Sequence, residues 1–242
     1  MKRLILMLQF LTKLPLPFEI SATEEDFSKG VIYFPVVGLI VGLLMAGVFY
    51  GVSLLSNTMI AAVFTVAFEV FITGGLHLDG LADTFDGLYS YRDKERMLEI
   101  MKDSRVGTNG VLILVISLIL KIALLYSITE PLLVIIIMPV VSRCMVVLMA
   151  AISKYAREKG MGGFFIEKTT KLQLFIAILI TLVVHILKPE LLIVSAIVLV
   201  LTLIYRYHVY TKIDGITGDV LGCVVELSEV FYLMIYILGL GV

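Results

Sequence analysis

Long apolar runs with very few charges dominate this chain. A membrane-spanning helix needs about 20 mostly apolar residues, and seven stretches meet this description: 31–54, 58–78, 110–128, 131–151, 171–187, 190–207 and 219–240. Sixty per cent of the 242 residues are hydrophobic and 16% are charged, whereas a soluble domain is roughly 45–50% apolar and about 25% charged. The composition therefore excludes a soluble or disordered protein. The unbroken runs also exclude an outer-membrane barrel, whose strands alternate in polarity over about ten residues.

We therefore expect an all-α, polytopic membrane helical bundle that forms a single membrane-embedded domain, 1–242. The two short runs on either side of 188–190 predict a tight helical hairpin. The N-terminal segment MKRLILMLQFLTKLPLP imitates a signal peptide but lacks a small-residue cleavage site, so we interpret it as a retained interfacial or re-entrant helix. Cys144 and Cys223 lie in apolar stretches and are predicted to be buried small side chains, neither disulfide partners nor zinc ligands.

Lys and Arg residues are distributed very unevenly among the connections. Sixteen of the nineteen lie in segments 1–30, 79–109, 152–171 and 206–212. On the other side only Lys188 is basic, and Lys121 and Arg143 fall within predicted spans. Because Lys and Arg next to spans stay in the cytoplasm, the N-terminus and the loops 79–109, 152–171 and 206–219 are predicted to be cytoplasmic. The C-terminus is then outside.

The densest acidic stretch, GGLHLDGLADTFDG at 74–87, follows the second apolar run. If it is helical, Asp79, Asp83 and Asp86 lie within an arc of about 60°. Carboxylates on one face repel each other unless a cation lies between them, and Mg²⁺ is the natural candidate because it binds carboxylate and phosphate oxygens. An ordinary hydrated helix end is the alternative. Three roles stay open for His77: metal ligand, general base or helix-end histidine.

A second polar stretch precedes the third span. Residues 95–101 predict a short amphipathic helix on the membrane surface, and DSRVGTNG at 103–110 predicts a glycine-punctuated turn. Backbone N–H groups at a helix start, together with Lys102 and Arg105, suit an anionic phosphate. A solvated loop with a helix cap is the alternative.

A third stretch, DGITGDVLG at 214–222, opens the last span. Glu226 lies seven residues after Asp219 and hence on the same helix face, and Glu229 follows it. Ionisable groups within a span are costly and usually face the bundle interior, so Glu69 and Arg143 are candidate partners of these acids. The sequence leaves the pairing open.

The stretches GGLHLDGLADTFDG (74–87) and MKDSRVGTNG (101–110) closely resemble the adenosylcobinamide-GDP ribazoletransferase family, also called cobalamin (5′-phosphate) synthases. Weaker matches at 10–17, 34–42 and 214–222 extend the resemblance over nearly the whole chain. Lys13 and Cys223 depart from the family's common Arg and Ala, and neither departure affects the predicted chemistry.

The resemblance implies an integral inner-membrane, Mg²⁺-dependent enzyme that performs the last assembly step of the cobalamin nucleotide loop on the cytoplasmic face. Adenosylcobinamide-GDP and α-ribazole, or α-ribazole 5′-phosphate, would give adenosylcobalamin, or its 5′-phosphate, and GMP. The implied metal ligands are Asp79, Asp83, Asp86 and Asp219, and the implied catalytic residues are His77, Asp83 and Arg105. The implied substrate-binding residues are Lys102, Asp103, Arg105, Gly107, Asn109, Asp214 and Thr217.

The expected partners are these small-molecule substrates and membrane lipid. The net charge of −1 offers no field for nucleic acid, and a homo-oligomer stays open. We expect Asp219 to approach the 79–86 cluster, where it would ligate a second metal or anchor a basic residue such as Arg105.

Three other functions compete with this interpretation. The acid pattern at 79–83 is analogous to that of CDP-alcohol phosphotransferases, which also use helix-borne aspartates. Acids within spans and glycine-interrupted helices also occur in cation-coupled transporters. A membrane scaffold without chemistry is the third alternative, and it leaves the acidic, glycine-rich stretches without a purpose.

The charge distribution makes a topology prediction. In a chain whose native cysteines are replaced by Ala, Ser104→Cys should not react with an impermeant maleimide outside intact cells, because the 79–109 loop is cytoplasmic. Ser56→Cys, between the first two spans, is the matched control and should react. Labelling of Ser104→Cys from outside would overturn the topology.

Overall fold

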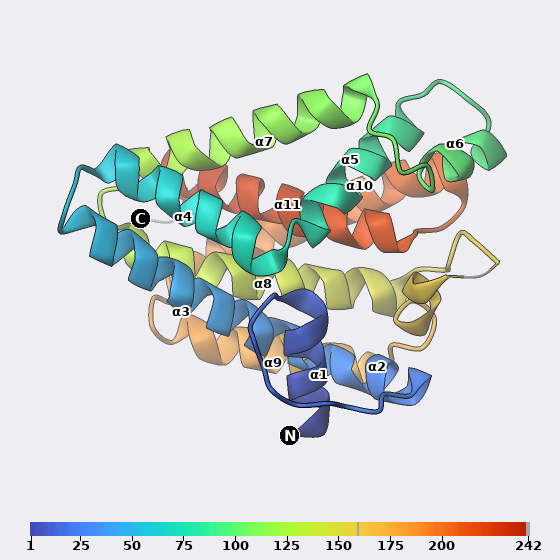
Figure 1. The fold of residues 1–242 in the computed structure, drawn as a ribbon, viewed down its shortest axis with the longest axis horizontal. Helices are drawn as coiled ribbons and strands as arrows, with labels where there is room; N and C mark the ends of the chain where they lie inside the picture. The colour runs from blue at the N-terminus through green and yellow to red at the C-terminus, as the bar shows by residue number, and fades with distance from the viewer. Residues whose placement is uncertain (159, 241–242) are drawn as a thin grey trace.

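The computed structural model describes residues 1–158 and 160–240, and this part of the chain is a bundle of helices (Figure 1). Three short turns of other helix types are η1 Val31–Tyr33, η2 Met161–Phe164 and η3 Tyr236–Leu240. The α-helices are α1 Lys2–Leu11, α2 Glu24–Gly30, α3 Phe34–Ser53, α4 Thr58–Thr73, α5 Leu76–Leu88, α6 Lys94–Ile100, α7 Thr108–Ser127, α8 Pro131–Ile152, α9 Lys171–His185, α10 Leu191–Ile213 and α11 Gly218–Ile235.

The predicted polytopic helical bundle is confirmed, and the spans are of three kinds. Five helices are long and apolar enough to cross a membrane: the continuous segment Glu24–Ser53, α7, α8, α10 and the segment Gly218–Gly239. A sixth crossing is possible through α4 and α5 together, as a pair bent by 88°. The remaining predicted span is α9, an apolar helix of 15 residues that is shorter than a usual span.

The prediction of one continuous second span over 58–78 is wrong. Helix α4 ends at Thr73, and Gly74 and Gly75 follow with φ of 62° and 71°. This left-handed conformation costs glycine little but strains other residues, so the glycine pair can turn the chain where hydropathy shows only a continuous apolar run. After the turn, α5 packs mainly against α11 and α7.

The predicted loop 206–219 is also too long. Helix α10 continues to Ile213, so Arg206 and Lys212 lie on the helix and only 214–217 connects it to α11. The Arg206 guanidinium donates to Ser153 Oγ at 2.9 Å and to the Ile152 carbonyl at 2.6 Å. These bonds tie the end of α8 to α10, and the second one satisfies a carbonyl group that a helix end leaves free.

The predicted N-terminal helix is present as α1, and the predicted surface helix at 95–101 is present as α6. Helix α2 was not expected from the apolar pattern, although Thr23 and Asp26 form a capping box at its start. Lys2 and Arg3 of α1 pair with Asp26 at 2.7 and 3.3 Å. Helix α6 and the connections that precede α9 and α11 gather at one end of the bundle (Figure 1).

Helices α5 and α11 approach unusually closely at two glycines. A Cβ on Gly80 would lie 2.6 Å from the Asp219 carbonyl oxygen, and a Cβ on Gly222 would lie 3.3 Å from the Gly80 Cα. Small residues at a helix crossing let two backbones come close within a membrane. This contact brings the acidic helix α5 against the start of α11.

The glycine contact predicts that Gly80→Ala destabilises the protein. The added methyl group meets backbone, which cannot move aside cheaply, so we expect a loss of about 1–3 kcal/mol in unfolding free energy and a lower melting temperature in detergent. Gly47→Ala is the matched control, because a Cβ there meets nothing within 4 Å. Equal melting temperatures for the two variants would contradict the prediction.

Candidate active site

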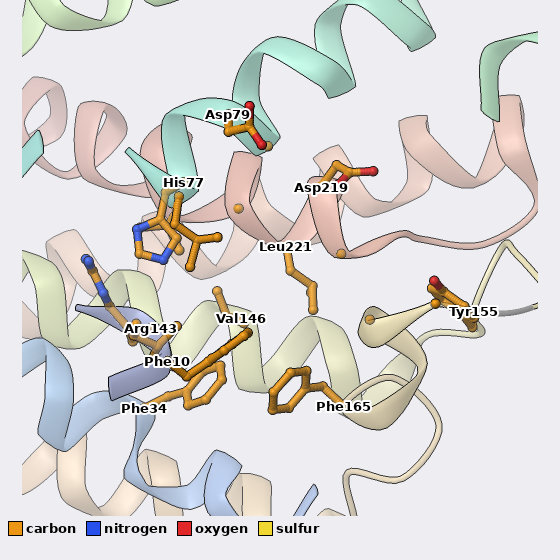
Figure 2. A pocket seen from close by; sticks show the side chains of 18 of the residues that line it. Phe10, Phe34, His77, Asp79, Arg143, Val146, Tyr155, Phe165, Asp219 and Leu221 are labelled. Atoms are coloured by element: carbon orange, nitrogen blue, oxygen red, sulfur yellow. The ribbon is translucent and has the colours of Figure 1, made fainter. Parts of the chain in front are cut away.

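A cavity of about 240 Å³ lies between α5, α8, α11 and the segment that follows α8 (Figure 2). Asp79, Asp219 and Arg157 line one part of it, and His77 and Arg143 line another. Figure 2 shows His77 beside Arg143, with Phe34 and Phe165 on the opposite wall from Asp79. The cavity therefore combines a charged part with an apolar part.

A short backbone pairing joins the loop that precedes Asp219 to the segment that follows α8. Ala156 N donates to the Ile216 carbonyl and Ile216 N donates to the Lys154 carbonyl, both at 2.9 Å, in a parallel bridge. Thr217 caps α11, because its Oγ1 accepts from Val220 N at 3.3 Å. The loop 214–217 thus pairs with the segment that follows α8, and the Asp219 backbone at the start of α11 meets α5 at Gly80.

Asp219 anchors a basic residue, which is one of the two expected alternatives, and this residue is Arg157 and not the suggested Arg105. Arg157 Nη2 lies 2.7 Å from Asp219 Oδ2, and both side chains are largely buried. Thr217 Oγ1 also donates to Asp219 Oδ2 at 3.2 Å. The sequence identifies Arg157 only as one of the basic residues predicted to be cytoplasmic. The glycine-rich run at 160–163 is the one local feature that could have indicated a close approach between this loop and other backbone.

Asp79 and Asp83 lie on helix α5, which forms as the 74–87 pattern predicts. Asp79 is exposed and lines the cavity, whereas Asp83 is half-buried one turn further along. The salt bridges among residues 1–158 and 160–240 involve neither carboxylate. Two acidic groups without a basic partner beside the Asp219–Arg157 pair are a suitable donor set for a hard cation.

Asp86 has a different environment from the other two acids on α5. Its two carboxylate oxygens accept hydrogen bonds from Gly107 N at 2.6 Å and Gly110 N at 2.9 Å. These amides belong to the start of α7, where free N–H groups and the helix dipole favour a negative charge. Asp86 therefore joins α5 to α7, and its role as a metal ligand stays a prediction.

The predicted phosphate-binding loop lies outside the cavity wall. Arg105 is 87% exposed and pairs with Asp103 at 2.7 Å, and this guanidinium lowers the pKa of Asp103 to about 2. Lys102 is exposed, and Asn109 Nδ2 donates to the Tyr89 carbonyl at 3.2 Å.

Asp214 also lies outside the cavity wall, where it pairs with Lys94 at 3.1 Å. The Asp214 side chain is 76% exposed. The roles of Asp214 and of the 102–109 residues in substrate binding stay predictions.

The acids within the spans form one buried ionic cluster. Lys121 Nζ lies 3.0 Å from Glu69, 2.8 Å from Glu226 and 2.5 Å from Glu229. Arg143 pairs with Glu229 and donates to Ser142 Oγ at 3.0 Å. The pairing that the sequence leaves open is thus Lys121 with three glutamates and Arg143 with one of them.

The three glutamates also have the spacing of a metal site, since one oxygen of each lies within 4.8 Å of the others. The ammonium of Lys121 contacts all three, however, and supplies the positive charge that a metal ion would bring. Buried charges need such partners. We therefore assign this cluster to the ionic core of the bundle.

Comparison with known proteins identifies the family. Residues 3–237 match the model of the cobalamin-5-phosphate synthase family. The chain belongs to this family. It is 45% identical to an adenosylcobinamide-GDP ribazoletransferase of Clostridioides difficile (strain 630), over 98% of each chain. It is 46% identical to one of Alkaliphilus metalliredigens (strain QYMF), over 100% of this chain and 97% of the relative. No solved structure matches it significantly.

Membership of the cobalamin-5-phosphate synthase family confirms the resemblance stated for the motifs at 74–87 and 101–110. The chain is a transferase of cobalamin biosynthesis with membrane helices. The transporter, the scaffold and the CDP-alcohol phosphotransferase are thereby set aside.

The ionic cluster predicts that Lys121→Met strongly destabilises the bundle. Removing the ammonium leaves three buried carboxylates with one arginine, and breaking a buried ion pair costs about 3–5 kcal/mol. We expect a lower yield of monodisperse protein and a lower melting temperature in detergent. The exposed Lys171 provides the control variant Lys171→Met. Adding Glu69→Gln to Lys121→Met should restore part of the loss, and a Lys121→Met protein as stable as the control would refute the assignment.

Proposed function

We propose that the cavity beside Asp79, Asp219 and Arg157 is where this enzyme joins its two substrates. The reaction that the family resemblance implies links α-ribazole, or its 5′-phosphate, to adenosylcobinamide-GDP and releases GMP. The observation that carries the proposal is that Asp79 and Asp219, 140 positions apart in sequence, line one cavity with a buried arginine. A diphosphate substrate calls for this combination of acids for a metal ion and an arginine for phosphate.

Asp79, Asp83 and Asp219 would hold Mg²⁺, with Asp86 as a further ligand through its remaining lone pairs. These residues suit a metal ion because Asp79 and Asp83 have no basic partner among the described residues and α11 places Asp219 beside them. Bound Mg²⁺ would neutralise negative charge on the diphosphate and on the departing GMP.

The bond changes follow from the reaction. A ribose hydroxyl oxygen of α-ribazole bonds to the phosphorus attached to cobinamide, the bond from that phosphorus to the GMP oxygen breaks, and the hydroxyl proton passes to a base. Since α-ribazole 5′-phosphate keeps its phosphate in the product, the attacking hydroxyl is not the 5′ one. We assign the base to an α5 aspartate, because His77 lies at the other part of the cavity beside Arg143 (Figure 2).

Arg157 would bind the diphosphate by exchanging part of its contact with Asp219 for phosphate oxygens. Its Nε is buried and has no hydrogen-bond partner among the described residues, so it has a donor to offer. Lys102 and Arg105 lie outside the cavity wall. We propose that they contact the part of the nucleotide that extends beyond it, with Arg105 released from Asp103.

The site would face the cytoplasm. The support is the concentration of Lys and Arg in the connections at 79–109 and 152–171, together with their position at the α6 end of the bundle (Figure 1). Nucleotide-activated substrates are available on that side.

Asp83→Asn and Asp79→Asn should each lower kcat by at least about 100-fold, because each removes a charge from the metal site and preserves the shape of the side chain. Removal of both should cost little more than removal of one, since residues that serve one function are not additive. GMP release from adenosylcobinamide-GDP, followed at a series of Mg²⁺ concentrations, measures the effect.

Asp93→Asn is the control for this series, because Asp93 caps α6 and Asn caps as well. We expect it to keep full activity. Full activity of Asp83→Asn, or of the unmodified enzyme in excess EDTA, would overturn the metal site.

A further inference from the structure

The apolar part of the cavity has no role in phosphate chemistry. Phe34 and Phe165 are each 4% exposed and their ring centroids lie 5.5 Å apart. Phe10 lies 5.5 Å from Phe165 by the same measure, and Val146 completes this wall. Aromatic and aliphatic side chains of this kind form the walls of pockets for flat apolar ligands.

Two nitrogen-bearing side chains lie at this part of the cavity without using all of their donors. Arg143 is 1% exposed, and its Nε has no hydrogen-bond partner among the described residues. His77 is 5% exposed. The hydrogen bonds of histidine in the described residues belong to His185 and His208, so the His77 ring has none. A buried donor without a partner, such as Arg143 Nε, is rare in proteins, and the His77 ring in the same part of the cavity is free to donate to a ligand.

Three parts of the substrates could occupy the apolar part of the cavity: the corrin ring, the guanine base and the benzimidazole base. The size and chemistry of the cavity distinguish between them. At about 240 Å³ it is smaller than the roughly 300–1,000 Å³ of pockets for whole drug-sized ligands, so it excludes a corrin ring. Guanine carries donors and acceptors around its edge, and the wall of Phe34, Phe165 and Val146 would leave most of them unpaired. A benzimidazole is flat and apolar except for one ring nitrogen that accepts a hydrogen bond.

We propose that this part of the cavity binds the benzimidazole base of α-ribazole, with the phenylalanines against the ring and His77 as donor to its free nitrogen. The inference rests on the proposed function. It makes His77 a specificity residue for the nucleoside. Arg143, held by Glu229 and Ser142, lies beside the His77 ring (Figure 2).

The decisive experiment compares α-ribazole with an analogue whose free ring nitrogen is replaced by C–H, as in an indole riboside. For the unmodified enzyme we expect KM to be at least about 10-fold higher for the analogue, because a buried donor loses its partner. In His77→Phe the ratio of the two KM values should fall to near one. The KM for adenosylcobinamide-GDP and the Mg²⁺ dependence should stay unchanged.

A second variant tests the position of the base by filling its space. Val146→Phe should raise the KM for α-ribazole at least about 10-fold and leave the KM for adenosylcobinamide-GDP within twofold. Val183→Phe is the control, because Val183 is 63% exposed on α9. Size-exclusion chromatography and the melting temperature in detergent establish whether Val146→Phe folds. If Val146→Phe does not fold, the His77→Phe comparison tests the inference by itself.

Three outcomes would overturn the inference and leave the proposed function standing. The first is an unchanged KM ratio in His77→Phe. The second is a collapse of kcat in His77→Phe with the ratio intact, which would make His77 the general base. The third is a Val146→Phe variant that raises the KM for adenosylcobinamide-GDP instead. Failure of the unmodified enzyme to release GMP with α-ribazole and Mg²⁺ would instead overturn the proposed function.

Discussion

The contact between one ammonium group and three carboxylates organises this bundle. Lys121 of α7 contacts Glu69 of α4 and Glu226 and Glu229 of α11. Glu229 in turn binds Arg143 of α8. Charges in a membrane interior are costly unless they are paired. The four helices must therefore meet in one register, because any other register leaves charges without partners.

The cavity depends on that register. The same α11 that carries Glu226 and Glu229 begins at Asp219, and it meets α5 at Gly80 and Gly222. The arrangement that buries the ionic cluster thus also places Asp219 against the acidic helix. Arg143 belongs to both, since it binds Glu229 and lines the cavity. The stability of the core and the geometry of the site are therefore physically coupled.

Hydropathy and helical periodicity are local properties, and the predictions that rest on them succeeded where local forces decide. The apolar runs correspond to helices, and the stretch that carries Asp79, Asp83 and Asp86 is the helix α5, which meets the condition under which these acids share one face. The failure at the second span has a conformational cause. The run over 58–78 hides an 88° bend because hydropathy does not report the sign of φ at Gly74 and Gly75.

The amino-acid sequence by itself determined the helical membrane class, the family and the acidic face of α5, since these depend on composition, motif and local spacing. Only the tertiary structure decided that Arg157 pairs with Asp219, that Asp86 caps α7, and that Lys121 joins three glutamates. Each of these contacts joins residues more than 20 positions apart. A carboxylate's partner depends on which helix packs beside it, and that choice is made by the packing of the whole bundle.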